Sequence, residues 1–226
     1  VTGVDFSSRP FKVQLSSSTL EASSVIIATG ATARWLGIPS EQKYIGRGVS
    51  SCAVCDAAFF RGKDVVVVGG GDTAMEDSVY LTKFVNSVTL VHRRDTFRAS
   101  AIMQQKVFSN DKIKIIYNSI VEEIFGEGKV AGVKLRNLKT NEVAELKADG
   151  VFVAIGNEPS TKFLVGKLPL DEHGYIITHE EVKTDIPGVF AAGDVADRRY
   201  QQAITAAASG AKAAIEASDF LQSLKA

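Results

Sequence analysis

The stretch from residue 52 to residue 98 contains three motifs in close succession: CAVCD at 52–56, VVVVGGGDTA at 65–74 and VTLVHRRDTFR at 88–98. The first motif is a pair of thiols with a carboxylic acid directly behind it. The second is an apolar strand that runs into a glycine turn. The third is a strand that ends in a cluster of basic residues. We therefore expect thiol chemistry and a phosphate-binding turn side by side.

The middle motif fits the pattern G-x-G-x-x-G/A, with Gly69, Gly71 and Ala74 at the three fixed positions. The first glycine of such a turn makes the bend, the second lets the backbone touch a pyrophosphate, and the small third residue packs helix on strand. Free N–H groups at the helix start then attract the phosphates. A strand precedes the motif and helical periodicity follows it, so we predict a dinucleotide-binding βαβ unit. The alternative is an ordinary glycine-rich turn.

The end of the second strand indicates which dinucleotide binds. Sites for NAD usually have an acidic residue there, which holds the ribose 2′-hydroxyl. This chain has His92, Arg93 and Arg94 instead, with Arg98 close behind. Guanidinium groups attract a 2′-phosphate through forked donors, which favours NADPH over NADH. The alternative is a solvated basic turn.

Cys52 and Cys55 are the two cysteines of the chain. Two thiols in this spacing are redox-active or form half of a metal site, and two buried structural thiols are the third possibility. A structural zinc ion needs four ligands, and the three histidines do not supply a second pair, so we predict no metal. A helix start can lower the pKa of one thiol and favour exchange through a mixed disulfide. Asp56 could protonate a leaving thiolate or cap a helix.

The composition is that of a globular protein, with 45% hydrophobic and 23% charged residues. Lys plus Arg equals Asp plus Glu at 26 each, so no overall field favours nucleic acid or an anionic membrane. No apolar run reaches the roughly 18 residues of a membrane span. The first residue is Val, not Met, and we expect that an N-terminal part of a longer protein is missing.

The rest of the chain predicts an α/β fold. Two short apolar strands, 25–28 and 151–155, end in small residues and form a faint internal repeat, which suggests two nucleotide-binding domains. We predict a hairpin before residue 24, a βαβ unit over 65–91, a helix over 99–108, a strand over 113–117 and an antiparallel meander over 120–148. Strands are expected at 174–177 and 189–192, and a final helix from about 202 to 221. Residues 34–49 contain Gly, Pro and Ser and are predicted to be a linker or hinge, and residues 157–159 are a second candidate hinge.

The motifs named above, followed by FVAIG at 152–156 and GDV at 193–195, resemble the low-molecular-weight thioredoxin reductase family in the same order along essentially the whole chain. The resemblance implies a homodimeric flavoprotein that passes electrons from NADPH through FAD and a disulfide to thioredoxin. It implies two Rossmann-like three-layer nucleotide-binding domains, with the NADPH domain (34–157) inserted into an FAD domain (1–33 and 158–226). In this family the NADPH domain rotates between two positions.

The resemblance also implies roles for individual residues. Cys55 would face the flavin, Cys52 would attack thioredoxin and Asp56 would be the general acid. The implied NADPH contacts are Gly69, Gly71, Asp72, Thr73, Ala74, His92, Arg93, Arg94, Arg98, Ile155 and Gly156. The implied FAD contacts are Thr29, Gly30, Gly193, Asp194, Gln202 and Ala203.

The chain departs from the family pattern in three places. The N-terminal strand with its own glycine motif for FAD is absent, Gln201 stands where the family usually has Arg, and Ala57 replaces a Gly. Two other functions stay open: a related NADPH flavoprotein that reduces another disulfide carrier, such as a peroxidase-linked one, and a nucleotide-binding module without turnover. A cytoplasmic location is expected, with an organelle as the alternative.

Overall fold

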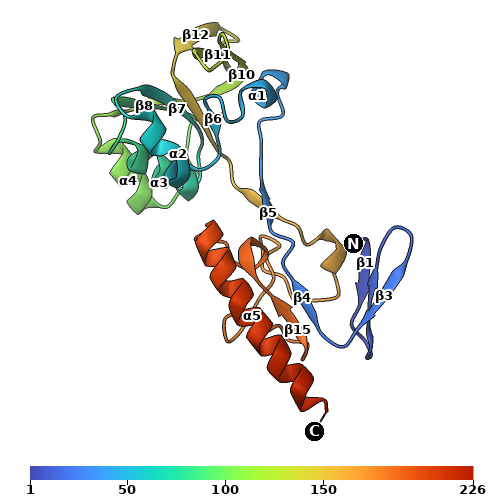
Figure 1. The fold of residues 1–226 in the computed structure, drawn as a ribbon. Coiled ribbons are helices and arrows are strands. Elements are labelled where there is room, and N and C mark those ends of the chain that lie inside the picture. Colours follow the sequence, from blue (N-terminus) through green and yellow to red (C-terminus); the bar gives the residue numbers. More distant parts are fainter. Residues whose placement is uncertain (226) are drawn as a thin grey trace. The chain divides into compact units, whose positions relative to one another are not determined.

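The computed structural model describes residues 1–225, and the chain divides into two compact units (Figure 1). The first, which we call the split unit, combines residues 1–32 with the chain from residue 157 onward. The second, the inserted unit, is Ala33–Gly156. The fold is therefore mixed α/β, with one unit placed within the sequence of the other. Each unit is described by itself.

A five-stranded parallel sheet forms the centre of the inserted unit, in the order β6-β13-β7-β8-β9. In its register Ala154 lies opposite Gly69, and Val68 lies opposite Val91. The carboxyl ends of three neighbouring strands therefore reach the same edge of the sheet, which is where open α/β sheets bind ligands. The strands are β6 Val49–Ser50, β7 Asp64–Gly69, β8 Ser87–Val91, β9 Ile113–Ile116 and β13 Gly150–Ala154.

Both faces of this sheet are covered, which explains why β7 is a continuous run of valines. Val65 and Val67 pack in a core with the helices on one face. Val66 and Val68 pack on the other face in a core with the antiparallel sheet β10-β11-β12. The predicted βαβ unit and meander are confirmed, and the unit has three layers. The helices are α2 Ala53–Asp56, α3 Asp72–Leu81 and α4 Ala101–Phe108, and the meander strands are β10 Ser119–Phe125, β11 Gly132–Asn137 and β12 Val143–Lys147.

The hinge predicted over residues 34–49 is wrong as a description of that segment. It folds into helix α1, Pro39–Tyr44, which begins at a proline and packs against β10. The side chain of Tyr44 is buried, and its hydroxyl donates to the carbonyl oxygen of Gly126 over 2.7 Å. The buried carboxylate of Glu41 accepts the N–H groups of Leu36 and Gly37. The Gly, Pro and Ser content of this segment therefore marks a tight turn with a buried apolar side.

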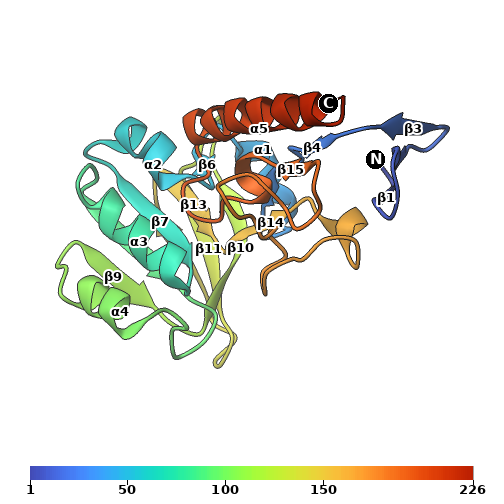
Figure 2. The same ribbon diagram turned by 90° about the horizontal axis from the view of Figure 1, so that it is seen from below.

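The split unit contains the antiparallel sheet β1-β2-β3, which confirms the predicted hairpin and adds a strand to it. Strands β4 and β15 pair in parallel, and helix α5 lies along them (Figure 2). The apolar run 25–27 suggests a strand covered on both faces, but Ile26 in β4 is exposed, so one face of this strand is open within the described chain. The elements are β1 Gly3–Asp5, β2 Phe11–Gln14, β3 Thr19–Ala22, β4 Val25–Ile27, β15 Val189–Ala191 and α5 Ala203–Ser223.

The strand predicted at residues 174–177 is not formed. One isolated bridge, between Leu170 and Ile176, takes its place. The carboxylate of Asp171 accepts the N–H groups of His173 and Tyr175, each over 2.8 Å, and Gly174 has φ +88°. Because these N–H groups donate to a side chain, they are not available for the hydrogen bonds of a strand ladder, and the segment forms a loop.

The chain passes between the units twice. Strand β5, Ala31–Ala33, and strand β14, Asn157–Pro159, carry these crossings and pair with each other. The N–H of Arg34 donates to the carbonyl oxygen of Gly156 over 2.9 Å, so the two ends of the inserted unit adjoin. The observed divisions, after residues 32 and 156, lie one residue before the predicted ones.

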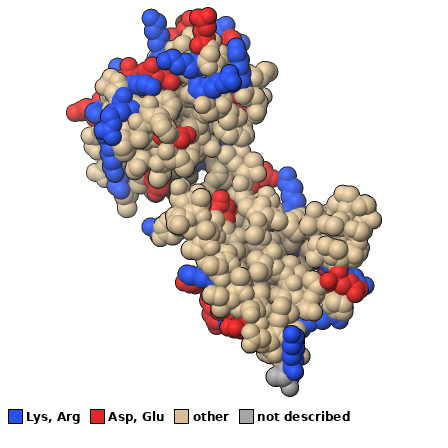
Figure 3. Space-filling view, viewed as in Figure 1, with Lys and Arg blue, Asp and Glu red and all other residues tan. Residues whose placement is uncertain are grey.

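Charges of both signs occur on each unit on the face shown in Figure 3. Among residues 1–225, no helix has the length and hydropathy to cross a bilayer. Within the same residues, no three metal-ligating side chains come together in a way that could hold an ion.

Asp77 on α3 makes the stability of the protein depend on pH. Burial raises the pKa of its carboxyl to about 7, and the nearby Glu76 adds to the rise. The folded state therefore holds a proton that the unfolded state releases, between pH of about 4 and about 7. Stability from this group is present at low pH and is lost as the pH rises through that window.

We predict that Asp77→Asn stabilises the protein at pH of about 8 by roughly 1–3 kcal/mol and changes little at pH of about 4, because the amide carries no charge to desolvate. Urea unfolding of both proteins at the two pH values measures this. Glu127→Gln, which removes an exposed acid of the same unit that does not act on Asp77, is the control, with a small effect at either pH. Equal stability of Asp77→Asn and the parent at the higher pH would contradict the assignment.

Candidate active site

The glycine turn packs the start of α3 closely against the sheet. A Cβ atom at Gly69 would lie 2.4 Å from the carbonyl oxygen of Ala154 and 2.6 Å from the Cβ of Ala74. The first and third positions of the motif must therefore be small. Gly71 is the N-cap of α3, and a Cβ there would meet nothing within 4 Å. The space beside the helix start at Gly71 is therefore open, which leaves room for a pyrophosphate at the N-terminus of α3.

Residues 92–100, which we call the basic loop, are fixed onto this turn by hydrogen bonds. The N–H of Arg98 donates to the carbonyl oxygen of Gly70 over 2.8 Å. The N–H and hydroxyl of Ser100 donate to Asp72 Oδ1 over 2.8 and 2.9 Å. The carboxylate of Asp72, a predicted nucleotide contact, is therefore engaged as the anchor of the loop. No sequence motif marks Ser100 as part of the site.

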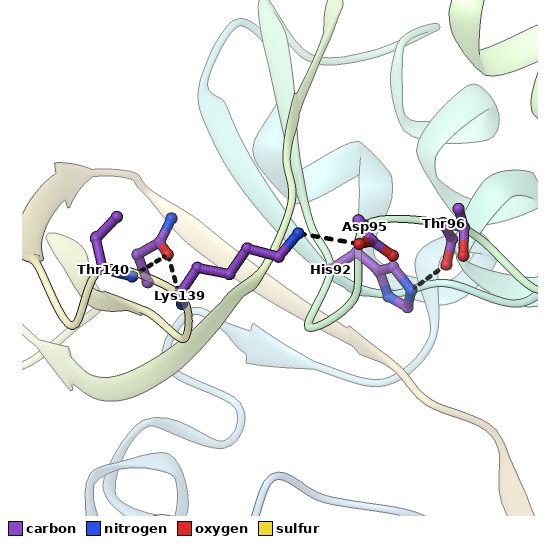
Figure 4. A network of polar contacts seen from close by, with 6 residues as sticks. His92, Asp95, Thr96, Lys139 and Thr140 are labelled. Carbon is purple, nitrogen blue, oxygen red and sulfur yellow. Dashed lines mark hydrogen bonds and ion pairs between the residues drawn. The ribbon is translucent and has the colours of Figure 1, made fainter.

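The ring of His92 is buried against the glycine turn, whereas the neighbouring arginines are exposed. It is only 6% exposed, its ring stacks at 5.0 Å on Phe97, and its Nε2 lies 3.0 Å from the carbonyl oxygen of Thr96 (Figure 4). Burial lowers the pKa of His92, although hydrogen bonds to the backbone of Thr96 and Gly69 partly oppose this. A buried imidazole held by backbone partners supports the turn and is not exposed to a phosphate.

The three guanidinium groups of the basic loop are available to a ligand. Arg93, Arg94 and Arg98 are exposed. No carboxylate within residues 1–225 forms an ion pair with any of them. Charged donors that no protein acceptor satisfies are suited to a phosphate dianion.

Three further predicted contacts lie at the same edge of the sheet. Thr73 is exposed in the first turn of α3. Ile155 and Gly156 directly follow β13, the neighbour of β7, and Gly156 has φ +93°. The residues predicted to bind NADPH are therefore gathered around the carboxyl ends of β7, β8 and β13.

The dithiol lies on α2 of the same unit, and α2 packs against α3. Cys52 and Cys55 form a disulfide, in which Cys52 is half-buried and Cys55 exposed. The N–H of Cys55 points at Cys52 Sγ over 3.2 Å, so the helix start faces this sulfur and favours its thiolate. Asp56 precedes the short 3-10 helix η1, Ala57–Phe60, but makes no capping hydrogen bond through its side chain. The alternative that Asp56 is a helix cap is therefore not supported.

The predicted FAD contacts are gathered at the carboxyl ends of the two parallel strands of the split unit. Thr29 and Gly30 follow β4, and Gly193 and Asp194 follow β15. Asp194 Oδ1 is buried without a hydrogen-bond partner in the described chain, and burial raises the pKa of its carboxyl. A buried acceptor without a donor is costly, so it fits a ligand hydroxyl that would donate to it.

Helix α5 begins beside these strands, as predicted for Gln202 and Ala203. Gln202 is its N-cap and forms a reciprocal capping box with Thr205. Gly193, with φ +77°, donates its N–H to Ser209 Oγ over 2.8 Å, which ties the loop to the helix. Ser209 lies about two turns into α5, and no sequence motif marks it as part of the site.

The comparisons with known proteins agree with this arrangement. The family model of pyridine nucleotide-disulphide oxidoreductase matches residues 1–210. A thioredoxin reductase of Rickettsia conorii is 50% identical over 226 residues, which cover 98% of this chain and 73% of the relative. Thioredoxin reductase 2 of Arabidopsis thaliana is 52% identical over 234 residues, covering 99% of this chain and 61% of the relative.

Solved structures give the same result. The thioredoxin reductase of Streptococcus pyogenes superimposes with a TM-score of 0.94 at 44% identity, over 98% of this chain and 73% of that one. The enzyme of Giardia duodenalis gives 0.93 at 48% identity, over 98% and 74%. The chain belongs to the pyridine nucleotide-disulphide oxidoreductase family. Within that family, these relatives are all thioredoxin reductases.

We predict that Gly70→Ala weakens NADPH binding by about tenfold or more, because overpacking typically costs 1–3 kcal/mol. The added Cβ would lie 2.1 Å from the ring of His92, so the ring or the turn has to move. Titration of the nicotinamide fluorescence measures the dissociation constant. Gly210→Ala is the control, since nothing lies within 4 Å of a Cβ there. Unchanged NADPH affinity in Gly70→Ala would show that the His92 support is dispensable.

Proposed function

We propose that this protein is a thioredoxin-disulfide reductase that passes electrons from NADPH, through FAD and the Cys52–Cys55 disulfide, to oxidised thioredoxin. One observation carries the proposal: the disulfide lies on a helix packed against the helix of a dinucleotide turn, and the loop after that turn presents unpaired arginines. The names of the relatives support the choice of thioredoxin as the partner.

We assign NADPH to the inserted unit. Gly69 and Ala74 would keep the turn tight against the sheet, and Gly71 would let the pyrophosphate approach the start of α3, with Thr73 beside it. Arg93, Arg94 and Arg98 would hold the 2′-phosphate, while His92 and Asp72 position the loop that carries them. Ile155 and Gly156 would border the nicotinamide half of the cofactor.

We assign FAD to the split unit. Asp194 would accept a hydrogen bond from the ribityl chain, with Thr29, Gly30 and Gly193 around it. Gln202 and Ala203 would lie under the pyrimidine ring, where the N-terminus of α5 favours negative charge. When bound, NADPH and FAD supply the hydride and the electron pair that reduce the disulfide.

The dithiol then performs the exchange with the partner. The Cys52 thiolate attacks the disulfide of thioredoxin, which gives a mixed disulfide and a thioredoxin thiolate, and Asp56 supplies the proton to a leaving thiolate. The Cys55 thiolate next attacks the Cys52 sulfur. This step releases the second thioredoxin sulfur and restores the Cys52–Cys55 disulfide, so two electrons have moved and no sulfur is left unpaired.

The proposal extends to assembly and location. We propose a homodimer, as the family resemblance implies. We also propose a cytoplasmic site of action. An organelle is the alternative, because one relative of 50% identity is the mitochondrial thioredoxin reductase 1 of Arabidopsis thaliana.

We predict that Cys52→Ser and Cys55→Ser each reduce NADPH-dependent thioredoxin reduction to background, because exchange requires both the attacking and the resolving sulfur. NADPH binding should stay within about twofold of the parent, since the turn is unchanged. The assay follows NADPH oxidation with thioredoxin and an aromatic disulfide on the full-length protein. Ser51→Ala is the control. Full turnover in either cysteine variant would refute the proposed exchange.

We predict that Arg93→Ala with Arg94→Ala removes the preference for NADPH over NADH. Charge-assisted hydrogen bonds contribute roughly 1.5–3 kcal/mol each, so the affinity for NADPH should fall tenfold or more while that for NADH barely changes. Binding titrations with both nucleotides measure the ratio. Arg61→Ala, which removes an arginine stacked on Phe84 of the same unit, is the control. An unchanged ratio in the double variant would refute the assignment of the phosphate site.

A further inference from the structure

The basic loop contains one acidic residue, Asp95, directly after the two adjacent arginines. Its side chain is 62% exposed, so its charge faces the same solvent from which a ligand approaches the loop and is screened mainly at high salt. A carboxylate there would repel the 2′-phosphate that the neighbouring guanidinium groups attract. A loop that selects a dianion therefore needs a way to neutralise Asp95.

Lys139 neutralises this carboxylate. Its Nζ donates to Asp95 Oδ2 over 3.0 Å, and the two residues lie 44 positions apart in the sequence (Figure 4). Lys139 belongs to the turn between β11 and β12, on the meander that covers the far face of the sheet from the helices. The ion pair thus connects a separate element of the inserted unit to the basic loop.

The backbone holds this turn in place. The side-chain oxygen of Asn137 accepts the N–H groups of Lys139 and Thr140 over 2.8 and 3.1 Å (Figure 4). The N–H of Leu138 donates to the carbonyl oxygen of Asn118 over 2.6 Å, and the N–H of Asn118 donates to that of Arg94 over 3.1 Å. A chain of backbone hydrogen bonds therefore joins the turn to the loop and fixes where the Lys139 side chain starts.

The choice of partner for Asp95 is informative. Arg93, Arg94 and Arg98 belong to the same loop, yet in the described chain the ion pair of Asp95 is made by Lys139. Because Lys139 pairs with Asp95, the arginines do not have to, and their forked donors suit a phosphate better than an ammonium group does. The hydrogen bond and charge of Lys139 also lower the pKa of Asp95, so this carboxyl stays ionised and paired.

We propose that Lys139 is a specificity-determining residue for the 2′-phosphate, and that it acts through Asp95 by cancelling the charge that would repel the phosphate. The inference rests on the proposed function of the basic loop. Both partners are largely exposed, and exposed ion pairs contribute little to folding stability. The pair therefore affects ligand selection and not the fold.

The first test is Lys139→Ala in the full chain, with NADPH and NADH as probes. We expect the dissociation constant for NADPH to rise about three- to tenfold at low ionic strength, because uncovered Asp95 repels the dianion. The constant for NADH should not change, and the effect should shrink at high salt, which screens exposed charges. The melting temperature should also be unchanged. Equal weakening for both nucleotides, or a marked loss of stability, would overturn the proposal.

Lys134→Ala is the matched control. Lys134 lies on β11 of the same meander and forms an ion pair with Glu123, also on the meander, with an N···O distance of 3.9 Å. Its removal takes away the same charge from the unit without uncovering an acid in the basic loop. If Lys134→Ala weakens NADPH as much as Lys139→Ala does, only the net charge of the unit matters and the proposal fails.

The second test is a double-mutant cycle with Asp95→Asn. If Lys139 acts through Asp95, Lys139→Ala has no effect on NADPH binding in the Asp95→Asn background. If the weakening persists there, the lysine acts on the phosphate directly and the route through Asp95 is wrong. The Arg93→Ala, Arg94→Ala variant separates the two levels of inference: an unchanged nucleotide preference in it refutes the phosphate site itself, whatever Lys139 does.

Discussion

The close approach of backbone segments at Gly69 and Gly70 is the constraint on which the nucleotide site depends. Gly69 lets β7, β13 and α3 meet within contact distance, and Gly70 leaves the room that the ring of His92 fills. The buried ring in turn connects the basic loop to the glycine turn, because Thr96 of the loop and Gly69 of the turn both supply backbone partners to it. A side chain at either glycine would displace the strand end, the helix start or the loop, and all three carry the site.

Charge in the inserted unit is organised so that anchoring and ligand binding use different residues. The acids near the site are both occupied: Asp72 by Ser100 and Asp95 by Lys139. The arginines are not occupied by any acid of the described chain. This division prevents the loop from closing on itself through internal salt bridges, which would compete with a bound phosphate. The positive potential is therefore local even though the chain as a whole has no net charge.

The sequence was most informative where periodicity and glycine spacing act locally. The valine run of β7, the turn after it and the helical pattern of α3 predicted the βαβ unit, because each signal lies within a few residues of the next. It was misleading at residues 34–49, where Pro and Gly suggested a linker although Tyr44 is buried. At residues 174–177 the sequence predicted a strand, but the carboxylate of Asp171 accepts the N–H groups of His173 and Tyr175 and holds a loop instead.

The predicted site residues came together at the strand ends, but their division into roles could not be read from the sequence. The burial of His92 depends on the space that Gly70 leaves, which is a three-dimensional property. The pairing of Asp95 with Lys139 joins elements that no local pattern relates.

The two ends of the inserted unit meet at the hydrogen bond between Arg34 and Gly156. Because its ends adjoin, the inserted unit interrupts the split unit at a single point. Strands β4 and β15 of the split unit therefore pair directly, although the inserted unit separates them in the sequence. Adjoining ends are the feature that makes domain insertion and circular permutation tolerable, because neither changes the path of the rest of the chain. A change in the sequence of the inserted unit can therefore leave the pairing of β4 with β15 intact.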